Sequence, residues 1–335
     1  MHTRRLGDHT VTAIGSGDLC LATSAARGIP ARELEHAVHE TIEFGITLID
    51  VAGDADSEKL AGQVVRELGA RDRVVVATRV PILAPRPGPP TRDLLRERLP
   101  APYVQDRIEA SLRATRLDAL PLAQLPLSPV WRASPAWPEL VGTCARLVRE
   151  GKVLTWGAML DEPDHEAAPA LAAEPWLAAL SVVYHLWDRR AEPLLGVAAK
   201  RELAVLARQP LAGGALTGNL GPGVGLPPRD DRNALAPARL ERIAVAIAGL
   251  AALVKREPPA VRSYDAARQV AERAERPEHL ECDDVAELAL RFVIDRVGIA
   301  LPRLHRRDYL MPGIAAAAAP PLSADLVARI LDDPR

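Results

Sequence analysis

The stretch TLIDVAGDADSEKLAG, residues 47–62, contains a short strand followed almost at once by a helix. The apolar run Thr47–Asp50 predicts a buried strand, and a helix is expected near Ser57–Leu68. Asp54 and Asp56 stand beside Ser57, where acidic residues suit a turn and a helix N-cap. The stretch therefore predicts a βα unit that leaves an aspartate, Asp50, at the end of its strand.

The same alternation of strand and helix runs along the rest of the chain. Further helices are expected near Ala31–Phe44, Val104–Thr115, Trp137–Glu150, Ala191–Lys200 and Asp284–Val297. The other predicted strands are Thr12–Gly15, Val74–Thr78, Ala119–Leu125, Val153–Gly157, Ala179–Tyr184, Ala204–Ala207 and Ile299–Leu301. Strands that alternate with helices in this way predict an α/β fold, a (β/α)8 TIM barrel. A doubly wound sheet is the alternative, but "GSGD" at Gly15–Asp18 is too short for the GxGxxG motif of that fold.

The ends and the long connections complete the predicted architecture. Arg4–Ala13 is expected to form a β-hairpin that turns at Gly7-Asp8 and plugs the N-terminal end of the barrel. The proline-rich segment "VPILAPRPGPP", residues 80–90, predicts a long loop at the C-terminal edge. Residues 213–280 predict a large insertion within a single domain, 1–335. Long loops at this edge indicate covers over a site.

Composition excludes several classes of function. The 42 basic and 44 acidic residues give a net charge of −2, which argues against a nucleic acid or an anionic membrane as partner. The chain has no long apolar run, and its N-terminal residues lack a signal peptide, so we expect a cytoplasmic protein. Cys20, Cys144 and Cys282 lie far apart, which predicts reduced thiols and neither a disulfide framework nor a metal site.

An ordered series of motifs resembles the aldo/keto reductase superfamily over nearly the whole chain. After "TLID" and "DSEKLAG" come "VVVATR", "SLRATRLDALPLAQL", "LVREGKVLTWG", "VVYHLWDRRAE", "LARQPLAGGALTG" and "ELALRFVI". The resemblance implies a barrel that reduces carbonyl groups with NADPH. In that chemistry a tyrosine gives a proton to the carbonyl oxygen, a lysine and an aspartate tune the tyrosine, and a histidine hydrogen-bonds the carbonyl.

Only the aspartate of this tetrad is present, as Asp50. The tyrosine position is Ala55, in a stretch one residue short of the family pattern, the lysine position is Arg79 and the histidine position is Pro126. Alanine has no proton to give, arginine is not deprotonated in proteins, and proline offers no donor at all. Asp50 and Arg79 are expected to form a buried ion pair, because buried charges need partners whether or not they react.

Other residues at the same edge are candidate substitutes for the lost acid. Asp18, Asp54 and Asp56 lie at this edge, His185 ends the sixth strand, and Tyr103 precedes the third helix. Burial at the edge of a barrel shifts such groups toward a neutral pKa, as acid–base catalysis needs. The competing interpretation is structural, as turn and N-cap residues or ordinary polar side chains.

The expected nicotinamide site is also altered. Where the family holds the carboxamide, this chain has Met159 and Leu160 after the fifth strand and Ser181 on the sixth, and only the serine keeps a hydrogen-bonding group. The loop from Arg208 through Leu211 to Gly213 agrees with the family and is expected to lie along the cofactor pyrophosphate.

The position expected to bind the adenosine 2′-phosphate is rich in basic residues. Arg303, His305, Arg306 and Arg307 would bind a phosphate, although Arg303 replaces a family glycine and Gly313 replaces a helix asparagine. An exposed basic turn explains the same residues without a ligand. The sequence leaves NADP binding open and predicts no metal.

Three functions remain in competition. The first is a noncatalytic barrel that binds a small molecule at its C-terminal mouth or acts on a partner protein. The second is a redox-neutral lyase, cyclase or isomerase of secondary metabolism on the same fold. The third is an NADP-dependent oxidoreductase with a substitute general acid. The replaced tetrad favours the first two, because the fold alone does not carry a function whose residues are absent.

Overall fold

The computed structural model describes residues 1–84, 93–160, 168–254 and 284–332. Part of the proline-rich loop, residues 255–280 of the predicted insertion and Cys282 lie outside these ranges. The single-domain boundaries therefore stay a prediction.

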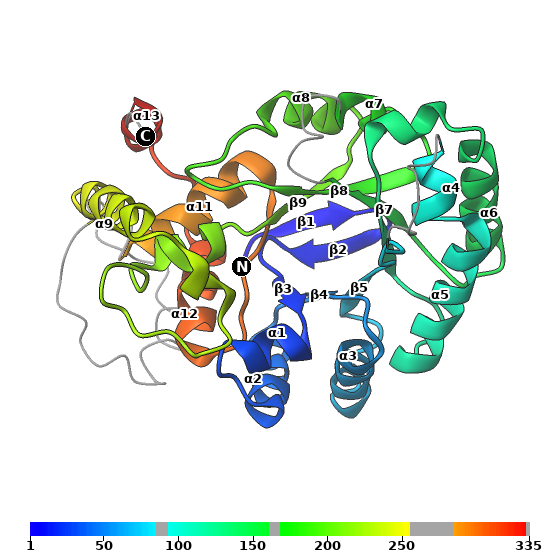
Figure 1. The fold of residues 1–335 in the computed structure, drawn as a ribbon, viewed down its shortest axis with the longest axis horizontal. Helices are drawn as coiled ribbons and strands as arrows, with labels where there is room; N and C mark the ends of the chain where they lie inside the picture. The colour runs from blue at the N-terminus through cyan, green and yellow to red at the C-terminus, as the bar shows by residue number, and fades with distance from the viewer. Residues whose placement is uncertain (85–92, 161–167, 255–283, 333–335) are drawn as a thin grey trace.

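Eight parallel strands form a nearly closed barrel with helices around it (Figure 1). Each strand pairs with the next in sequence, from β3 to β10. A bridge between Ile14 and Ala300 brings the first and last strands together. The barrel strands are β3 (Ser16–Leu19), β4 (Leu48–Val51), β5 (Val75–Arg79), β6 (Leu122–Pro126), β7 (Trp156–Met159), β8 (Leu177–Val183), β9 (Ala204–Arg208) and β10 (Ile299–Leu301). The TIM barrel expected from the sequence is confirmed.

Helices surround the strands, and buried apolar residues of helices and strands share the core clusters. The main helices are α1 (Leu21–Ala26), α2 (Ala31–Glu43), α3 (Ala55–Glu67), α4 (Leu94–Arg98), α5 (Ala101–Thr115), α6 (Trp137–Arg149), α7 (Ala168–Ala172), α8 (Glu192–Lys200), α9 (Pro237–Ala251), α11 (Val285–Val297), α12 (Arg307–Ala318) and α13 (Ala324–Asp332). Short 3₁₀ helices are η1 (Pro129–Ala133), η3 (Ala212–Thr217) and η4 (Asp231–Ala234). None of the described helices is both long and apolar enough to cross a membrane.

The N-terminal hairpin lies across the barrel, as expected. Strands β1 (Thr3–Leu6) and β2 (His9–Thr12) pair antiparallel. Gly7 turns the chain with a φ of +55°, a conformation that favours glycine. Leu6 and Val11 are buried in the same cluster as the inward side chains of the barrel strands, so the hairpin seals the core at this end.

Two local predictions were wrong. The first barrel strand is Ser16–Leu19 and not Thr12–Gly15, because Thr12 pairs with Thr3 in the hairpin. Helix α5 begins at Ala101, so Tyr103 lies inside a helix and not before one. Both errors come from choosing boundaries by apolar runs, whereas the hairpin partner and Pro100 at the helix N-cap set them.

Several other strands are displaced by a few residues from the prediction. Val153 makes only an isolated bridge to Leu120, so β7 begins at Trp156. At their carboxyl ends β5 includes Arg79 and β6 includes Pro126, one residue beyond the predicted boundary. The strand pairing thus extends into the residues of the expected site. Pairing with the neighbouring strands keeps these residues in the sheet, although a search for apolar runs does not include them.

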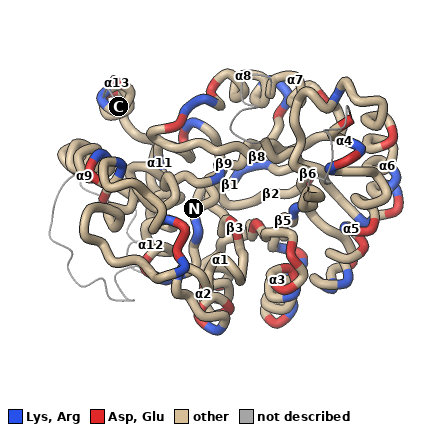
Figure 2. Tube along the Cα trace, viewed as in Figure 1, with Lys and Arg blue, Asp and Glu red and all other residues tan. Residues whose placement is uncertain are grey.

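The period-two alternation of the strands decides which side chains enter the mouth. Leu48, Ala77 and Leu122 belong to the inner cluster of the barrel. Side chains two residues further along a strand point to the same face. Asp50, Arg79 and Gln124 consequently project inward at the carboxyl end. Charged residues elsewhere have both signs mixed along the outer helices (Figure 2).

Candidate functional site

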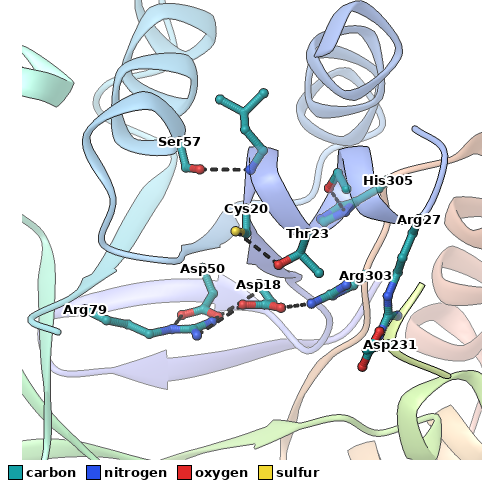
Figure 3. A network of polar contacts seen from close by, with 12 residues as sticks. Asp18, Cys20, Thr23, Arg27, Asp50, Ser57, Arg79, Asp231, Arg303 and His305 are labelled. Atoms are coloured by element: carbon teal, nitrogen blue, oxygen red, sulfur yellow. Dashed lines mark hydrogen bonds and ion pairs between the residues drawn. The ribbon is translucent and has the colours of Figure 1, made fainter. Parts of the chain in front are cut away.

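Asp50 is the centre of a buried polar network at the barrel mouth (Figure 3). Its carboxylate is 1% exposed and pairs with the Arg79 guanidinium, with Nε 3.4 Å from Oδ1 and Nη2 closer to Oδ2. The Gln124 side-chain amide also donates to Oδ1 at 2.9 Å, and the Asp18 backbone N–H donates to Oδ2 at 3.1 Å. The expected ion pair between Asp50 and Arg79 is therefore present in the structure.

Asp18 extends the network to a second carboxylate and a second arginine. It has a φ of +52°, an uncommon backbone conformation for a residue other than glycine. Its Oδ1 lies 3.1 Å from Arg79 Nη1, and its Oδ2 accepts a hydrogen bond from Arg303 Nη2. Two aspartates and two arginines thus alternate across the mouth, and their formal charges cancel.

The pKa shifts follow from this alternation. Burial raises the pKa of the Asp18 carboxyl, but Arg303 and Arg79 outweigh burial and the net shift is downward. Burial disfavours the charged form of Arg79, yet Asp50 and then Asp18 more than offset it and raise the Arg79 pKa above its ordinary value. Arg79 is therefore a fixed charge that holds its proton.

The turn before the lost tyrosine position is packed tightly on Arg79. Gly53 has a φ of +56°, and a Cβ on it would lie 1.9 Å from the Arg79 carbonyl oxygen. Arg107 Nη2 donates to the Gly53 carbonyl at 2.9 Å from the other side. Ala55 then starts α3 as an exposed residue. Nothing at this position offers a proton to a ligand.

The two aspartates beside Ala55 are structural. Asp54 is the N-cap of α3 and accepts a hydrogen bond from the Ser57 N–H at 2.9 Å. Asp56 is exposed in the first turn of the helix, where its charge suits the helix dipole. The N-cap interpretation is confirmed for Asp54, whereas Asp56 lies inside the helix.

The remaining candidate acids are held by local contacts. In the turn after β8, His185 Nδ1 accepts a hydrogen bond from the Trp187 N–H at 3.2 Å. The Tyr103 hydroxyl donates to the Pro81 carbonyl at 2.8 Å, and burial raises the pKa of this phenol. These contacts give each side chain a structural role, and catalysis by either one stays a prediction.

A cavity of about 260 Å³ begins at Pro126, the lost histidine position. It lies between α4 and the segment that leads into η1. Its walls include Ile82, Leu94, Pro126, Leu127 and Trp131, with Arg98 as the charged member and Ser128 as a second polar one. The mouth therefore offers a mostly apolar surface where the family pattern has a hydrogen-bond donor.

The residues expected near nicotinamide present little polar surface. Leu160 is buried, and its carbonyl accepts a hydrogen bond from Arg208 Nη2 at 2.5 Å. The Ser181 hydroxyl is also buried and has no hydrogen-bond partner in the part of the chain that the structure describes. An orphaned buried hydroxyl is the one feature here that suits a carboxamide.

The loop after β9 turns sharply next to this point. Gln209, Ala212 and Gly213 all have positive φ, and the Leu211 carbonyl accepts hydrogen bonds from Gly214 N and Leu216 N at 2.9 and 3.1 Å. The loop is thus fixed by its own backbone. Its predicted contact with a pyrophosphate stays a prediction.

The four basic residues after β10 point to separate partners. Arg303 is bound to Asp18 inside the mouth, and Arg307 Nη1 lies 3.4 Å from Glu40 Oε1. His305 is 2% exposed, its Nδ1 lies 3.1 Å from Ser24 Oγ, and burial together with Arg303 lowers its pKa to about 4. Arg306 alone among the four is exposed. Arg303 Nη1 and His305 Nε2 nevertheless have no hydrogen-bond partner in the part of the chain that the structure describes, so phosphate binding here stays a prediction.

The sequence did not predict two features of the polar network around Asp50. Gln124 lies two residues before Pro126 on β6, so strand alternation could have placed it beside Asp50. Asp18 was considered as an acid but not as a partner of Arg79 and Arg303. Its place depends on a positive φ and a register shift between β3 and β4, which leave no signal in the residue pattern.

One cluster within the described ranges has side chains close enough to hold a metal ion. Glu35, His39 and Glu67 lie on α2 and α3, away from the residues of the mouth network. His39 Nε2 is 3.2 Å from Glu67 Oε2, and Gln63 donates to both glutamates. These mutual contacts account for the cluster without an ion.

The barrel and the position of Asp50 define a protein of the aldo/keto reductase type. The profile of the Aldo/keto reductase family matches residues 13–332, and the chain belongs to this family. It is 30% identical over 212 residues to the methylglyoxal reductase YeaE of Escherichia coli (strain K12), and the match covers 62% of this chain and 66% of that protein. It is 26% identical over 215 residues to the aldo-keto reductase YhdN of Bacillus subtilis (strain 168), covering 62% and 60%. The matches thus span somewhat less than two thirds of these relatives.

Solved structures agree in fold over almost the whole chain. The glycerol dehydrogenase AKR11B4 from Gluconobacter oxydans superposes with a TM-score of 0.70 at 20% identity, covering 98% of this chain and 94% of that one. An aldo-keto reductase from Klebsiella pneumoniae in complex with NADPH gives 0.61 at 25% identity, covering 98% and 93%.

Proposed function

We propose that this protein binds a small organic molecule at the C-terminal mouth of its barrel and has lost ordinary NADPH-dependent carbonyl reduction. The observation that carries the proposal is the state of Arg79, which is held between Asp50 and Asp18 and cannot relay a proton. Ala55 and Pro126 leave a carbonyl oxygen in this mouth without the donors that the family chemistry uses.

The retained carboxylate has a different task in this chain. In the family pattern the aspartate orients a lysine that tunes the catalytic tyrosine. Here Asp50 accepts from Arg79, Gln124 and the Asp18 N–H, which keeps the mouth folded around a neutral network. A noncatalytic barrel would act through its ligand or through a partner protein, and a redox-neutral enzyme of secondary metabolism would transform the ligand.

An NADP-dependent oxidoreductase is the second candidate. The orphaned Ser181 hydroxyl favours it, as does the 25% identical structure that holds NADPH. If NADPH binds, Ser181 would hold the carboxamide and the loop from Arg208 to Gly213 would border the pyrophosphate. The cofactor would supply hydride, and the proton would have to come from a group outside the tetrad. The separate contacts of Arg303, His305 and Arg307 weigh against this candidate, whereas the unsatisfied Arg303 Nη1 and His305 Nε2 favour it.

Two measurements separate the candidates. NADPH binding is measured by fluorescence titration and thermal shift, and reduction of nitrobenzaldehyde is followed by NADPH consumption. Loss of one preorganised donor to an oxyanion costs about 3 to 4 kcal/mol in other enzymes, so we expect turnover at least hundreds of times below that of an intact family member. Turnover at the family level would overturn the proposal and show that a substitute acid operates.

A restored variant tests whether the tetrad is the only thing missing. Ala55→Tyr, Arg79→Lys and Pro126→His are combined in one chain, with Arg79→Lys alone as the matched control. We expect weak or absent reductase activity, because Met159 and Leu160 leave a nicotinamide amide poorly held. Recovery of family-level turnover would show that NADPH still binds and that the replaced tetrad residues alone account for the loss of reduction.

A further inference from the structure

The cavity at Pro126 combines exposed apolar walls with one arginine. Leu94 is 47% exposed and Ile82 is 36% exposed, while Trp131 is half-buried beside them. Large apolar side chains that converge on a concave site and remain in contact with water are typical of a ligand surface. The volume of about 260 Å³ limits the ligand to a small molecule.

The backbone of Arg98 is fixed at the edge of the cavity by a hydrogen bond. Arg98 is the last residue of α4, and its carbonyl accepts a hydrogen bond from the Leu83 N–H at 2.9 Å. This bond joins the end of α4 to the segment that carries Ile82. The half-buried Arg98 side chain lines the cavity from this fixed point.

The Arg98 guanidinium has no ion pair with any residue in the described ranges. Asp93, at the other end of α4, accepts instead from the Ser134 hydroxyl at 2.6 Å and from the Arg96 N–H at 3.2 Å. The neighbouring sequence 85–92 contains no aspartate or glutamate. A guanidinium in an apolar wall with no anion of its own is suited to an anion that the ligand brings.

We propose that this cavity binds a small apolar carboxylic acid, with its carboxylate on Arg98 and its hydrocarbon body against Leu94 and Trp131. A planar carboxylate matches the fork of one guanidinium and is neutralised by it. A phosphate dianion would leave charge uncompensated beside Leu127 and Pro126. The proposal rests on the proposed function, since it names the ligand class of the same mouth.

The test compares ligands that share a phenyl group and differ in their polar head. 3-Phenylpropanoate, its neutral amide 3-phenylpropanamide and phenyl phosphate are titrated into the full-length protein without NADPH and followed by calorimetry. A hydrogen bond to a charged group contributes enough to change affinity about tenfold or more, so the carboxylate should bind at least tenfold more tightly than the amide. Arg98→Gln should abolish this preference.

Matched variants separate a direct contact from a general charge effect. Arg96→Gln removes the same charge from an exposed position on the same helix and should keep the preference. Arg98→Lys should retain part of it, and circular dichroism checks that each variant folds. The proposal would be overturned if acid and amide bind equally, if neither binds, or if phenyl phosphate binds more tightly than the acid. It would also be overturned if Arg96→Gln loses the preference for the acid as fully as Arg98→Gln does. Because NADPH is absent, these outcomes are independent of the reductase assays.

Discussion

Removal of the Arg79 guanidinium should destabilise the protein more than any exposed arginine does. In Arg79→Ala the buried Asp50 carboxylate loses its charged partner but keeps hydrogen bonds from Gln124 and the Asp18 N–H. Breaking a buried pair from one side costs roughly 3 to 5 kcal/mol. Two donors to Asp50 are retained, and the Arg79 side chain is 17% exposed. The expected loss in the free energy of unfolding is therefore near the lower end of this range, at about 3 kcal/mol.

This cost is large enough to measure in a thermal melt. An unfolding entropy of about 2.1 cal/mol/K per residue amounts to about 0.7 kcal/mol/K for 335 residues, so ~3 kcal/mol lowers the Tm by about 4 °C. Arg79→Lys should be much milder, because lysine still neutralises Asp50. Arg149→Ala, at an exposed position on α6, is the matched control and should melt like the wild type.

A double variant identifies the origin of the loss. In Arg79→Ala with Asp50→Asn the side chain at position 50 is neutral, and Asp18 loses Arg79 but keeps Arg303. The double variant should therefore melt above the Arg79→Ala single variant. If Arg79→Ala melts at the wild-type temperature, the two residues do not form a buried pair, and Arg79 is free to bind a ligand.

Two further predictions concern pH and helix capping. The pKa of His305 is lowered to about 4 from 6.5 by burial and then by Arg303, so the unfolded chain binds its proton first as pH falls. Stability should therefore decrease between pH 6.5 and about 4, by up to about 1.4 kcal/mol per pH unit, in urea titrations. His305→Gln should have a smaller slope in this window, and an unchanged slope would contradict the burial argument. Asp54→Ala should cost about 1 kcal/mol in the same titrations, because α3 loses its N-cap. Asp56→Ala, which removes an exposed charge without a cap, should cost clearly less, and equal losses would count against the capping role.

The sequence predicted the architecture better than it predicted the site. Strand alternation and motif order were sufficient for the barrel and for the pairing of Asp50 with Arg79, because both depend on periodicity and on the need of buried charge for a partner. The contact between Arg303 and Asp18 was not predictable in this way. It depends on the positive φ of Asp18 and on the curvature that brings β10 back to β3, and neither is encoded in a local pattern.

The basic residues after β10 show the same limit. On the sequence they are either one phosphate-binding group or an exposed basic turn. In the structure burial separates His305 from Arg306, and Glu40 contacts Arg307. Spacing along the chain indicated only that these charges are neighbours. The acids that compete for them come from β3 and α2, distant in sequence.

Gly53 makes the shape of the turn before position 55 a second obstacle to a family-like tyrosine, apart from the side chains themselves. The turn that it forms leaves no room for a Cβ beside the Arg79 carbonyl, and Arg107 holds it from the opposite side. New side chains at positions 55, 79 and 126 would therefore project from a backbone whose shape is adapted to the present residues. A tyrosine at the family position would therefore require a longer turn in addition to the side-chain changes at positions 55, 79 and 126.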